Sequence, residues 1–176
     1  MQNVERYLNS FGKYVIKQAR SNLTKGKKNV NKKLYNSLKF KVVRTAKGDY
    51  SVEFYMLDYG TFIDKGVSGT KKQQSYRNAQ NKVVASPYRY TSKRPPATIL
   101  EKWIKARGLK GRDKDTGRFI TDKAFSFALQ NTIFRSGIKG ISFFSRPIYL
   151  GTRKFGQNIL ESIKKDIVKE VKNNNK

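Results

Sequence analysis

The segment from Tyr55 to Thr70 constrains the fold more than any other part of the chain, because three glycines follow a predicted β-hairpin directly. Glycine is the usual residue where the backbone adopts a positive φ or passes close to another segment. The spacing therefore predicts a shaped backbone turn rather than a flexible linker. No catalytic side chain accompanies this turn, so we interpret it as an assembly joint; the alternative is that it only closes the fold of the monomer. The residues of the predicted joint are Tyr59, Gly60, Phe62, Asp64, Lys65, Gly66 and Gly69.

Two segments before the joint predict a β-hairpin. Residues 38–44 and 50–57 are β-branched or aromatic and roughly alternate with polar residues, as strands do. Residues 46–49 between them have the composition of a turn. We therefore expect two antiparallel strands.

Helical spacing predicts four helices around this hairpin. Apolar residues recur every three or four positions up to about Leu23, and again from about 153 to 172, where isoleucines give the last helix an apolar face. One intervening helix follows Pro95-Pro96 and ends at Gly108, and the other is capped by Thr121. We expect a single α+β domain over residues 1–176, in which an N-terminal helix and three later helices pack on a small antiparallel sheet.

The net charge of the chain is +27, from 39 basic and 12 acidic residues, and the chain has neither histidine nor cysteine. Such a charge indicates a polyanionic partner, which could be nucleic acid, acidic lipid or an acidic protein surface. The alternative is compositional drift, since lysine, asparagine, isoleucine and tyrosine are all abundant. Without histidine or cysteine, histidine-dependent nucleophiles and thiolate metal sites are excluded. No apolar run approaches the length needed to cross a membrane, so we do not expect a membrane to be a partner of this chain.

Residues 71–96 are predicted to form an extended basic arm, because they show no periodicity and contain no acidic residue. A structureless loop of this length is unusual in a compact domain and is typically functional or disordered. Two interpretations stay open, a solvated arm and an arm that is ordered by a neighbouring protein or by phosphate. The basic residues of the arm are Lys71, Lys72, Arg77, Lys82, Arg89, Lys93 and Arg94.

The carboxylates do not form a convincing catalytic or metal-binding pattern. Asp113 and Asp115 resemble the start of a calcium loop, but the twelfth position, which requires a bidentate glutamate, is Ala124. We predict a plain turn there, no enzymatic activity, no metal and no cofactor. A nuclease that uses Asp113, Asp115 and Asp122 remains a weak alternative.

Two aromatic sites are better explained by packing than by ligand binding. We expect Trp103 to anchor the core, and we expect Phe143 and Phe144 to pack in the core rather than in an interface. These phenylalanines begin a second motif, whose residues are Phe143, Phe144, Arg146 and Pro147.

Two short modules together resemble the head–tail connector (neck, or tail-completion) family of tailed bacteriophages. The first module is Tyr59-Gly60 with residues 62–66 and Gly69, and the second is residues 133–138 with residues 143–147. In that family, a first helix leads to a hairpin that ends in a Tyr-Gly or Glu-x-Gly turn. A later helix is followed by Gly-Ile and Phe-Phe-x-x-Pro/Ala stretches that dock on the sheet. The insertion at residues 71–96 is longer than in the simplest members.

The resemblance implies a non-enzymatic virion protein that forms a homo-oligomeric ring beneath the portal, in a siphophage-type neck or in the portal-proximal rings of larger podoviruses. Its partners would be the portal and adjacent neck or tail proteins, with packaged DNA close by. Its location would be the virion neck, and the host cytoplasm during assembly. The alternative is a basic protein that binds nucleic acid without sequence specificity, such as a cargo or DNA-condensing protein.

Overall fold

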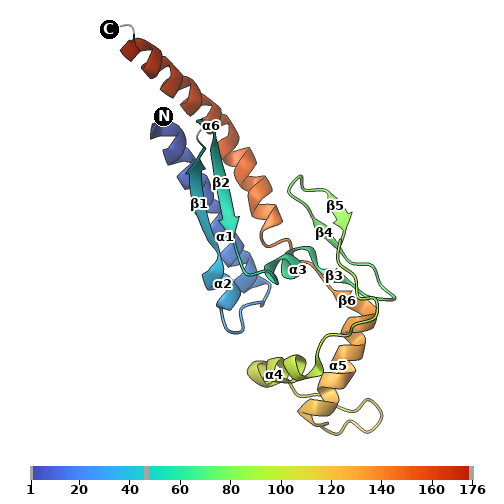
Figure 1. Cartoon of the computed structure of the whole chain (residues 1–176). Coiled ribbons are helices and arrows are strands. Elements are labelled where there is room, and N and C mark those ends of the chain that lie inside the picture. Colours follow the sequence, from blue (N-terminus) through green and yellow to red (C-terminus); the bar gives the residue numbers. More distant parts are fainter. Residues whose placement is uncertain (1, 46–47, 175–176) are drawn as a thin grey trace. The chain divides into compact units, whose positions relative to one another are not determined.

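The computed structural model describes residues 2–45 and 48–174 and confirms an α+β fold, in which helices accompany short antiparallel strand pairs (Figure 1). The sequence predicts a single domain, whereas the structure groups the chain into two compact units. The first unit contains Met1–Gly60, Arg77–Lys82 and Ser142–Lys176, and the second contains Thr61–Tyr76 and Val83–Ile141. In sequence, the whole of the second unit thus lies between the hairpin and the last helix of the first unit.

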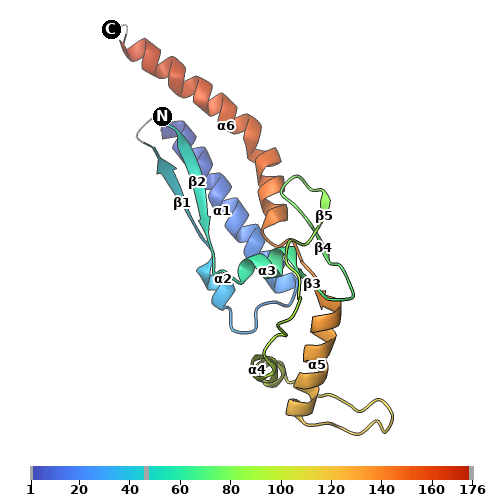
Figure 2. The ribbon, with the colours of Figure 1, turned by 45° about the vertical axis from the view of Figure 1, so that its right-hand side comes forward.

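The first unit is built on helix α1 (Gln2–Lys25), which lies beside the long helix α6 (Ser145–Asn174) in both ribbon views (Figures 1 and 2). A short helix, α2 (Lys33–Ser37), leads into the hairpin of β1 (Lys39–Arg44) and β2 (Tyr50–Tyr55). The predicted N-terminal helix and hairpin are therefore confirmed.

The hairpin register places its larger apolar residues on one face. Phe40 lies opposite Phe54, and Val42 lies opposite Val52. Phe54 makes an edge-on contact with Phe11 of α1, with 6.1 Å between ring centroids. This face therefore packs on α1, as the alternation of the two strands predicts. Of the predicted turn, Ala46 and Lys47 lie outside the described residues.

Helix α6 begins at Ser145, about eight residues before the start that the sequence predicts. In the sequence alone, Pro147 and Gly151 are residues typical of a connection between secondary-structure elements. Pro147 lies in the first turn, where its missing N–H leaves no hydrogen bond unmade. Gly151 is buried, and a Cβ there would lie 2.8 Å from the Phe11 ring. The glycine therefore permits close approach of α1 to α6 instead of ending the helix.

A carboxylate of α6 binds the first turn of α1. Asp166 is only 3% exposed, and it accepts hydrogen bonds from the Val4 backbone N–H at 3.1 Å and from the Asn3 side-chain amide at 2.9 Å. Burial acts to raise the pKa of this carboxyl, but the two hydrogen bonds outweigh it and hold the pKa below its ordinary value. The negative charge also complements the positive end of the α1 dipole.

Replacing Asp166 with asparagine should lower the free energy of unfolding by about 1–2 kcal/mol at neutral pH, the usual size of charged hydrogen bonds at a helix N-terminus. Because the folded-state pKa is depressed, the carboxylate stabilises fully above its unfolded-state pKa of about 3.9. This stabilisation disappears as the pH falls through the lower folded-state value. Urea titrations from neutral to acid pH should show the difference between Asp166→Asn and the unmodified protein shrinking. Glu161→Gln, an exposed site on the same helix, is the control, and a pH-independent difference at Asp166 would contradict this account.

The second unit holds two longer helices whose ends match the sequence prediction. Helix α4 (Ala97–Arg107) ends at Gly108, which has a left-handed φ of +62°, and helix α5 (Asp122–Ser136) is capped by the Thr121 hydroxyl, which accepts from the Ala124 N–H at 3.2 Å. Within residues 2–45 and 48–174, no helix combines the length and apolar character needed to cross a membrane.

The prediction that Trp103 anchors the core is wrong. Trp103 is 38% exposed, whereas the adjacent Ile104 is fully buried. Neighbouring residues on a helix point about 100° apart, so only one of the two can face the interior. Ile104 takes that position.

Candidate functional site

Two glycine pairs with identical spacing, Gly66 with Gly69 and Gly137 with Gly140, lie against one another in the second unit, and we call them the glycine node. Gly66 and Gly69 flank β3 (Val67–Ser68), and Gly137 begins β6 (Gly137–Ile138), which pairs antiparallel with β3. A Cβ on Gly69 would lie 2.1 Å from the carbonyl oxygen of Arg135, a distance that no real Cβ tolerates. The two backbones therefore approach as closely as only glycine allows.

Two members of the node also require backbone angles that other residues avoid. Gly66 has a φ of +75°, and Gly137 has a φ of +78° with a ψ of −170°. The latter combination is essentially confined to glycine. A Cβ on Gly137 would also lie 2.1 Å from the carbonyl oxygen of Val67. Gly137 is thus constrained by its backbone angles and by its surroundings together.

Backbone hydrogen bonds join the two segments on both sides of the node. The Ile141 N–H donates to the Ile63 carbonyl at 3.1 Å, and the Thr70 N–H donates to the Phe134 carbonyl at 2.9 Å. The sequence predicts a shaped turn in this segment. The structure instead has a short helix, α3 (Gly60–Lys65), followed by the strand β3. The helix was not predicted, because six residues are too few to show helical periodicity.

The predicted joint residues do not gather on one surface. Gly60 is buried in the first unit, where a Cβ would lie 2.7 Å from the Met56 sulfur. In the second unit, Asp64 is buried, while Phe62 is exposed and meets Tyr88 edge-on with 4.6 Å between ring centroids. Tyr59 is exposed, and Lys65 is half-buried.

The prediction of a structureless arm at residues 71–96 is wrong in part. The segment contains a small hairpin of β4 (Ser75–Arg77) and β5 (Val83–Ala85). Its turn is closed by a hydrogen bond of 3.0 Å from the Asn78 N–H to the Lys82 carbonyl. Strands of three residues are too short for alternation to be recognised, so the sequence pattern missed them.

Arginines and lysines of the arm have different surroundings. All seven basic residues of the arm are exposed, and each of the three arginines also donates a side-chain hydrogen bond within the chain. The acceptors are the carbonyl of Asn81 for Arg77, the carbonyl of Thr70 for Arg89 and the side chain of Asn131 for Arg94. The arginines therefore help to shape the arm, and they share its solvent-facing charge with Lys71, Lys72, Lys82 and Lys93.

The second motif packs in the first unit. Phe143 is fully buried, which confirms the expected core position. Phe144 is half-buried and meets Phe54 of the hairpin edge-on, with 5.3 Å between ring centroids. Pro147 is buried and Arg146 is exposed. This stretch therefore contacts the hairpin through Phe144, while Phe143 accepts a hydrogen bond from Asn22 of α1.

Two carboxylates of the nuclease alternative, Asp113 and Asp115, lie in a turn, as predicted, whereas Asp122 begins α5. The Asp113 carboxylate accepts hydrogen bonds from the N–H and the hydroxyl of Thr116, both at 2.8 Å, and from the Asp115 N–H at 3.1 Å. These bonds, that from the Thr116 N–H foremost, hold the pKa of Asp113 below its usual value. Among the described residues, no three acidic side chains are grouped so that they could bind a metal ion.

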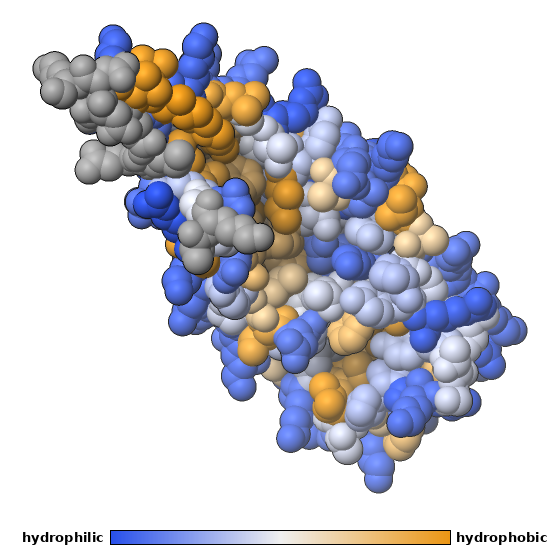
Figure 3. Space-filling view, turned by 45° about the horizontal axis from the view of Figure 1, so that its top comes forward, coloured by the Kyte–Doolittle hydropathy of each residue, from blue (hydrophilic) through white to orange (hydrophobic). Residues whose placement is uncertain are grey.

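An exposed apolar strip on α6 is the feature that the sequence reading missed. The inward-facing, buried positions in this part of the helix are Ser162 and Asp166, whereas the isoleucine stripe turns outward toward the C-terminus. Figure 3 shows an apolar strip beside the grey atoms, on a surface that is otherwise largely hydrophilic. The members of this α6 strip are Leu160, Ile167, Val168 and Val171, which are 68%, 47%, 45% and 54% exposed. The signal in the sequence was the four-residue spacing that Ile167 and Val171 continue. The buried face of α6 interrupts such an apolar pattern, because it contains Gly151 and Asp166.

The comparisons with known proteins add no assignment to this geometry. The glycine node, the docked Phe143-Phe144 pair and the α6 strip are properties of the chain itself. No model of a protein family, no curated protein and no solved structure matches it.

Proposed function

We propose that the chain is a non-enzymatic structural subunit, which forms a ring at the neck of a tailed phage and joins head to tail. The observation that carries this proposal is the α6 strip, where large apolar side chains stay exposed on a chain of net charge +27. Exposed apolar patches on such a polar protein mark sites of protein association. The resemblance of the two sequence modules to neck proteins supports the same assignment.

A ring requires two different surfaces on each subunit, repeated around an axis. The α6 strip supplies one of them in the first unit. The hairpin supplies an edge, since β1 pairs only with β2 in the described part of the chain. Strand edges accept further strands through backbone hydrogen bonds. The glycine node fixes the backbone of the second unit, so that its surfaces can be presented in a constant shape.

The charge of the chain limits which neighbours are compatible with a ring. Copies of a subunit with charge +27 repel one another. Acidic protein surfaces or DNA phosphates close to the ring would offset this repulsion. The lysines of the arm, Lys71, Lys72, Lys82 and Lys93, are suited to such contacts because their side chains are exposed.

Replacing Leu160 and Ile167 together with glutamate should reduce the joining of filled heads to tails by at least about tenfold, because two buried charges would replace apolar contacts. The fold should survive, since both side chains are exposed. Joining is measured as the yield of infectious particles when purified heads and tails are mixed with the variant protein.

The matched control is Val83→Glu with Ile99→Glu, which introduces the same charges at exposed apolar positions of the second unit. This control should join heads to tails normally. Equal joining by the Leu160/Ile167 variant and the unmodified protein would remove the α6 strip from the interface.

The net charge also favours a second candidate function, that of a protein that binds nucleic acid without sequence specificity. This function requires no oligomer, and it predicts that affinity for any duplex falls steeply as salt increases. Glutamates in the α6 strip would leave that affinity nearly unchanged beyond their effect on net charge. The mixing experiment above therefore separates the two functions.

A further inference from the structure

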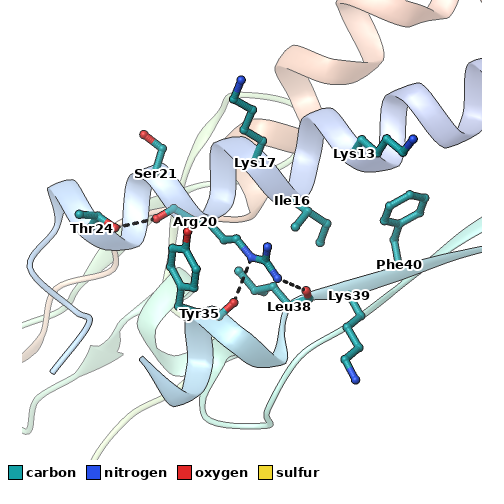
Figure 4. A pocket seen from close by; sticks show the side chains of 10 residues that line it. All are labelled: Lys13, Ile16, Lys17, Arg20, Ser21, Thr24, Tyr35, Leu38, Lys39 and Phe40. Atoms are coloured by element: carbon teal, nitrogen blue, oxygen red, sulfur yellow. Dashed lines mark hydrogen bonds between the residues drawn. The ribbon is translucent and has the colours of Figure 1, made fainter. Parts of the chain in front are cut away.

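A groove in the first unit lies between α1 and the start of β1, and the assembly proposed above does not use it. Its volume is about 670 Å³, within the range of ligand-binding pockets. Ten residues line it, and none of these is acidic (Figure 4). They are Lys13, Ile16, Lys17, Arg20, Ser21, Thr24, Tyr35, Leu38, Lys39 and Phe40.

Basic side chains surround the groove, and apolar side chains lie within it. Lys13 and Lys17 come from successive turns of α1, and Lys39 comes from the opposite side, from β1 (Figure 4). Between them lie Ile16 and Leu38, both buried, together with half-buried Phe40. The lysines are exposed, so their charge is available to a ligand.

Arg20 is fixed at one end of the groove. Its Nε donates to the Tyr35 carbonyl and its Nη2 donates to the Leu38 carbonyl, both at 3.1 Å, while its guanidinium lies 5.0 Å from the centre of the Tyr35 ring. An arginine has five N–H donors, so the group keeps donors beyond those in these two bonds. A guanidinium held in this way is suited to a carboxylate, which it can bind with two hydrogen bonds.

The shape of the apolar part argues against stacked bases. The Phe40 ring packs on α1, where a Cβ on Gly12 would lie 2.2 Å from it, and the Tyr35 ring is covered by Arg20. Stacking of single-stranded nucleic acid needs open aromatic faces beside a basic groove. Aliphatic side chains fit better between Ile16 and Leu38.

We propose that this groove binds an extended acidic segment of a partner protein, with aliphatic side chains against Ile16 and Leu38 and carboxylates at Lys13, Lys17, Arg20 and Lys39. Charge complementarity selects this occupant, because four basic side chains and no acidic one line the groove. The proposal does not depend on ring formation, since all the residues belong to the first unit of one chain.

The test uses the full chain and a short fluorescein-labelled peptide that alternates glutamate and leucine, with binding measured by fluorescence anisotropy. Replacing Lys13 and Lys17 with glutamate should weaken binding by about tenfold, the effect expected when several exposed charge pairs become repulsive. Lys39→Glu, on the opposite side of the groove, should weaken it as well. The control Lys164→Glu with Lys169→Glu makes the same change of net charge at exposed positions of α6 outside the groove, and it should change binding by less than about twofold.

Two further probes decide between ligand classes. A peptide that alternates glutamate and serine should bind more weakly than the leucine peptide, because it lacks the apolar contacts. Equal affinity for both peptides, or equal losses in the groove and control variants, would show that binding follows net charge alone and would overturn the proposal. Tighter binding of a labelled oligothymidylate that is lost in the Lys13/Lys17 variant would overturn it in favour of nucleic acid.

Discussion

Replacing Gly137 with alanine should lower the free energy of unfolding of the second unit by about 4 kcal/mol, the largest effect expected for any single methyl group in this chain. Two costs add. The backbone angles of Gly137 are essentially inaccessible to alanine, and the new Cβ would lie 2.1 Å from the Val67 carbonyl oxygen. Since the obstacle is backbone, a side-chain rotation cannot relieve it, and β3 would have to separate from β6.

Gly117→Ala is the matched control. Gly117 lies in the same unit and also has a positive φ, of +67°, but a Cβ there would meet nothing within 4 Å. Its replacement should cost only about 1 kcal/mol, the strain of the backbone alone. Urea denaturation followed by the fluorescence of Trp103, the one tryptophan of the chain, reports on this unit. Equal losses in the two variants would show that the close approach at the glycine node does not exist in solution.

Replacing Phe143 with alanine should lower the free energy of unfolding of the first unit by about 3–5 kcal/mol, the usual cost of removing a fully buried aromatic ring. Phe143 is completely buried, and its backbone carbonyl accepts a hydrogen bond of 3.3 Å from the Asn22 side chain of α1. The cavity left by the ring would lie beside α1, just before α6 begins.

Leu160→Ala is the comparison for this prediction, since Leu160 is exposed on α6 of the same unit. Its truncation should change the unfolding free energy by less than about 0.5 kcal/mol, as is usual for surface sites. The two variants are compared by urea denaturation followed by circular dichroism, to which the long helices α1 and α6 contribute strongly. If Phe143→Ala were as stable as Leu160→Ala, Phe143 would have to face a partner rather than the core.

Elements with a long or regular pattern could be predicted from the sequence. Helix α1 repeats its apolar residues along most of its length, and the two strands of the first hairpin alternate well enough to be recognised as a pair. The Thr121 cap and the Gly108 end were recognisable because each follows from local hydrogen bonding. Such features depend on interactions between residues that are close in sequence, so a single sequence is enough to predict them.

Features that depend on distant parts of the chain could not be predicted in the same way. From the sequence alone, Gly151 indicates the end of a helix, whereas in the structure it leaves the space in which Phe11 packs against α6. Trp103 is large and apolar, as core residues often are, but the adjacent Ile104 occupies the core position. On α6, the regular isoleucine stripe suggested a packed face, whereas the inward-facing position is held by Asp166 for its hydrogen bonds to α1.

The candidate sites were predicted in part. Gly66 and Gly69 were selected because glycines are dense there, but their partners Gly137 and Gly140 lie about seventy positions further along the chain. The shared Gly-x-x-Gly spacing could have suggested the pairing, since closely approaching segments often both require glycine. The groove at Arg20 could not be found from sequence, because it combines α1 with residues from α2 and β1 that show no common motif.

Cryo-electron microscopy of the vertex of phage particles that contain this chain tests the central proposal most directly. We expect a closed ring between portal and tail, in which each subunit shows α1 beside α6 and places the α6 strip against a neighbour. A vertex that lacks the chain, with its copies found instead along the packaged genome, would contradict the proposal and favour the nucleic-acid-binding alternative.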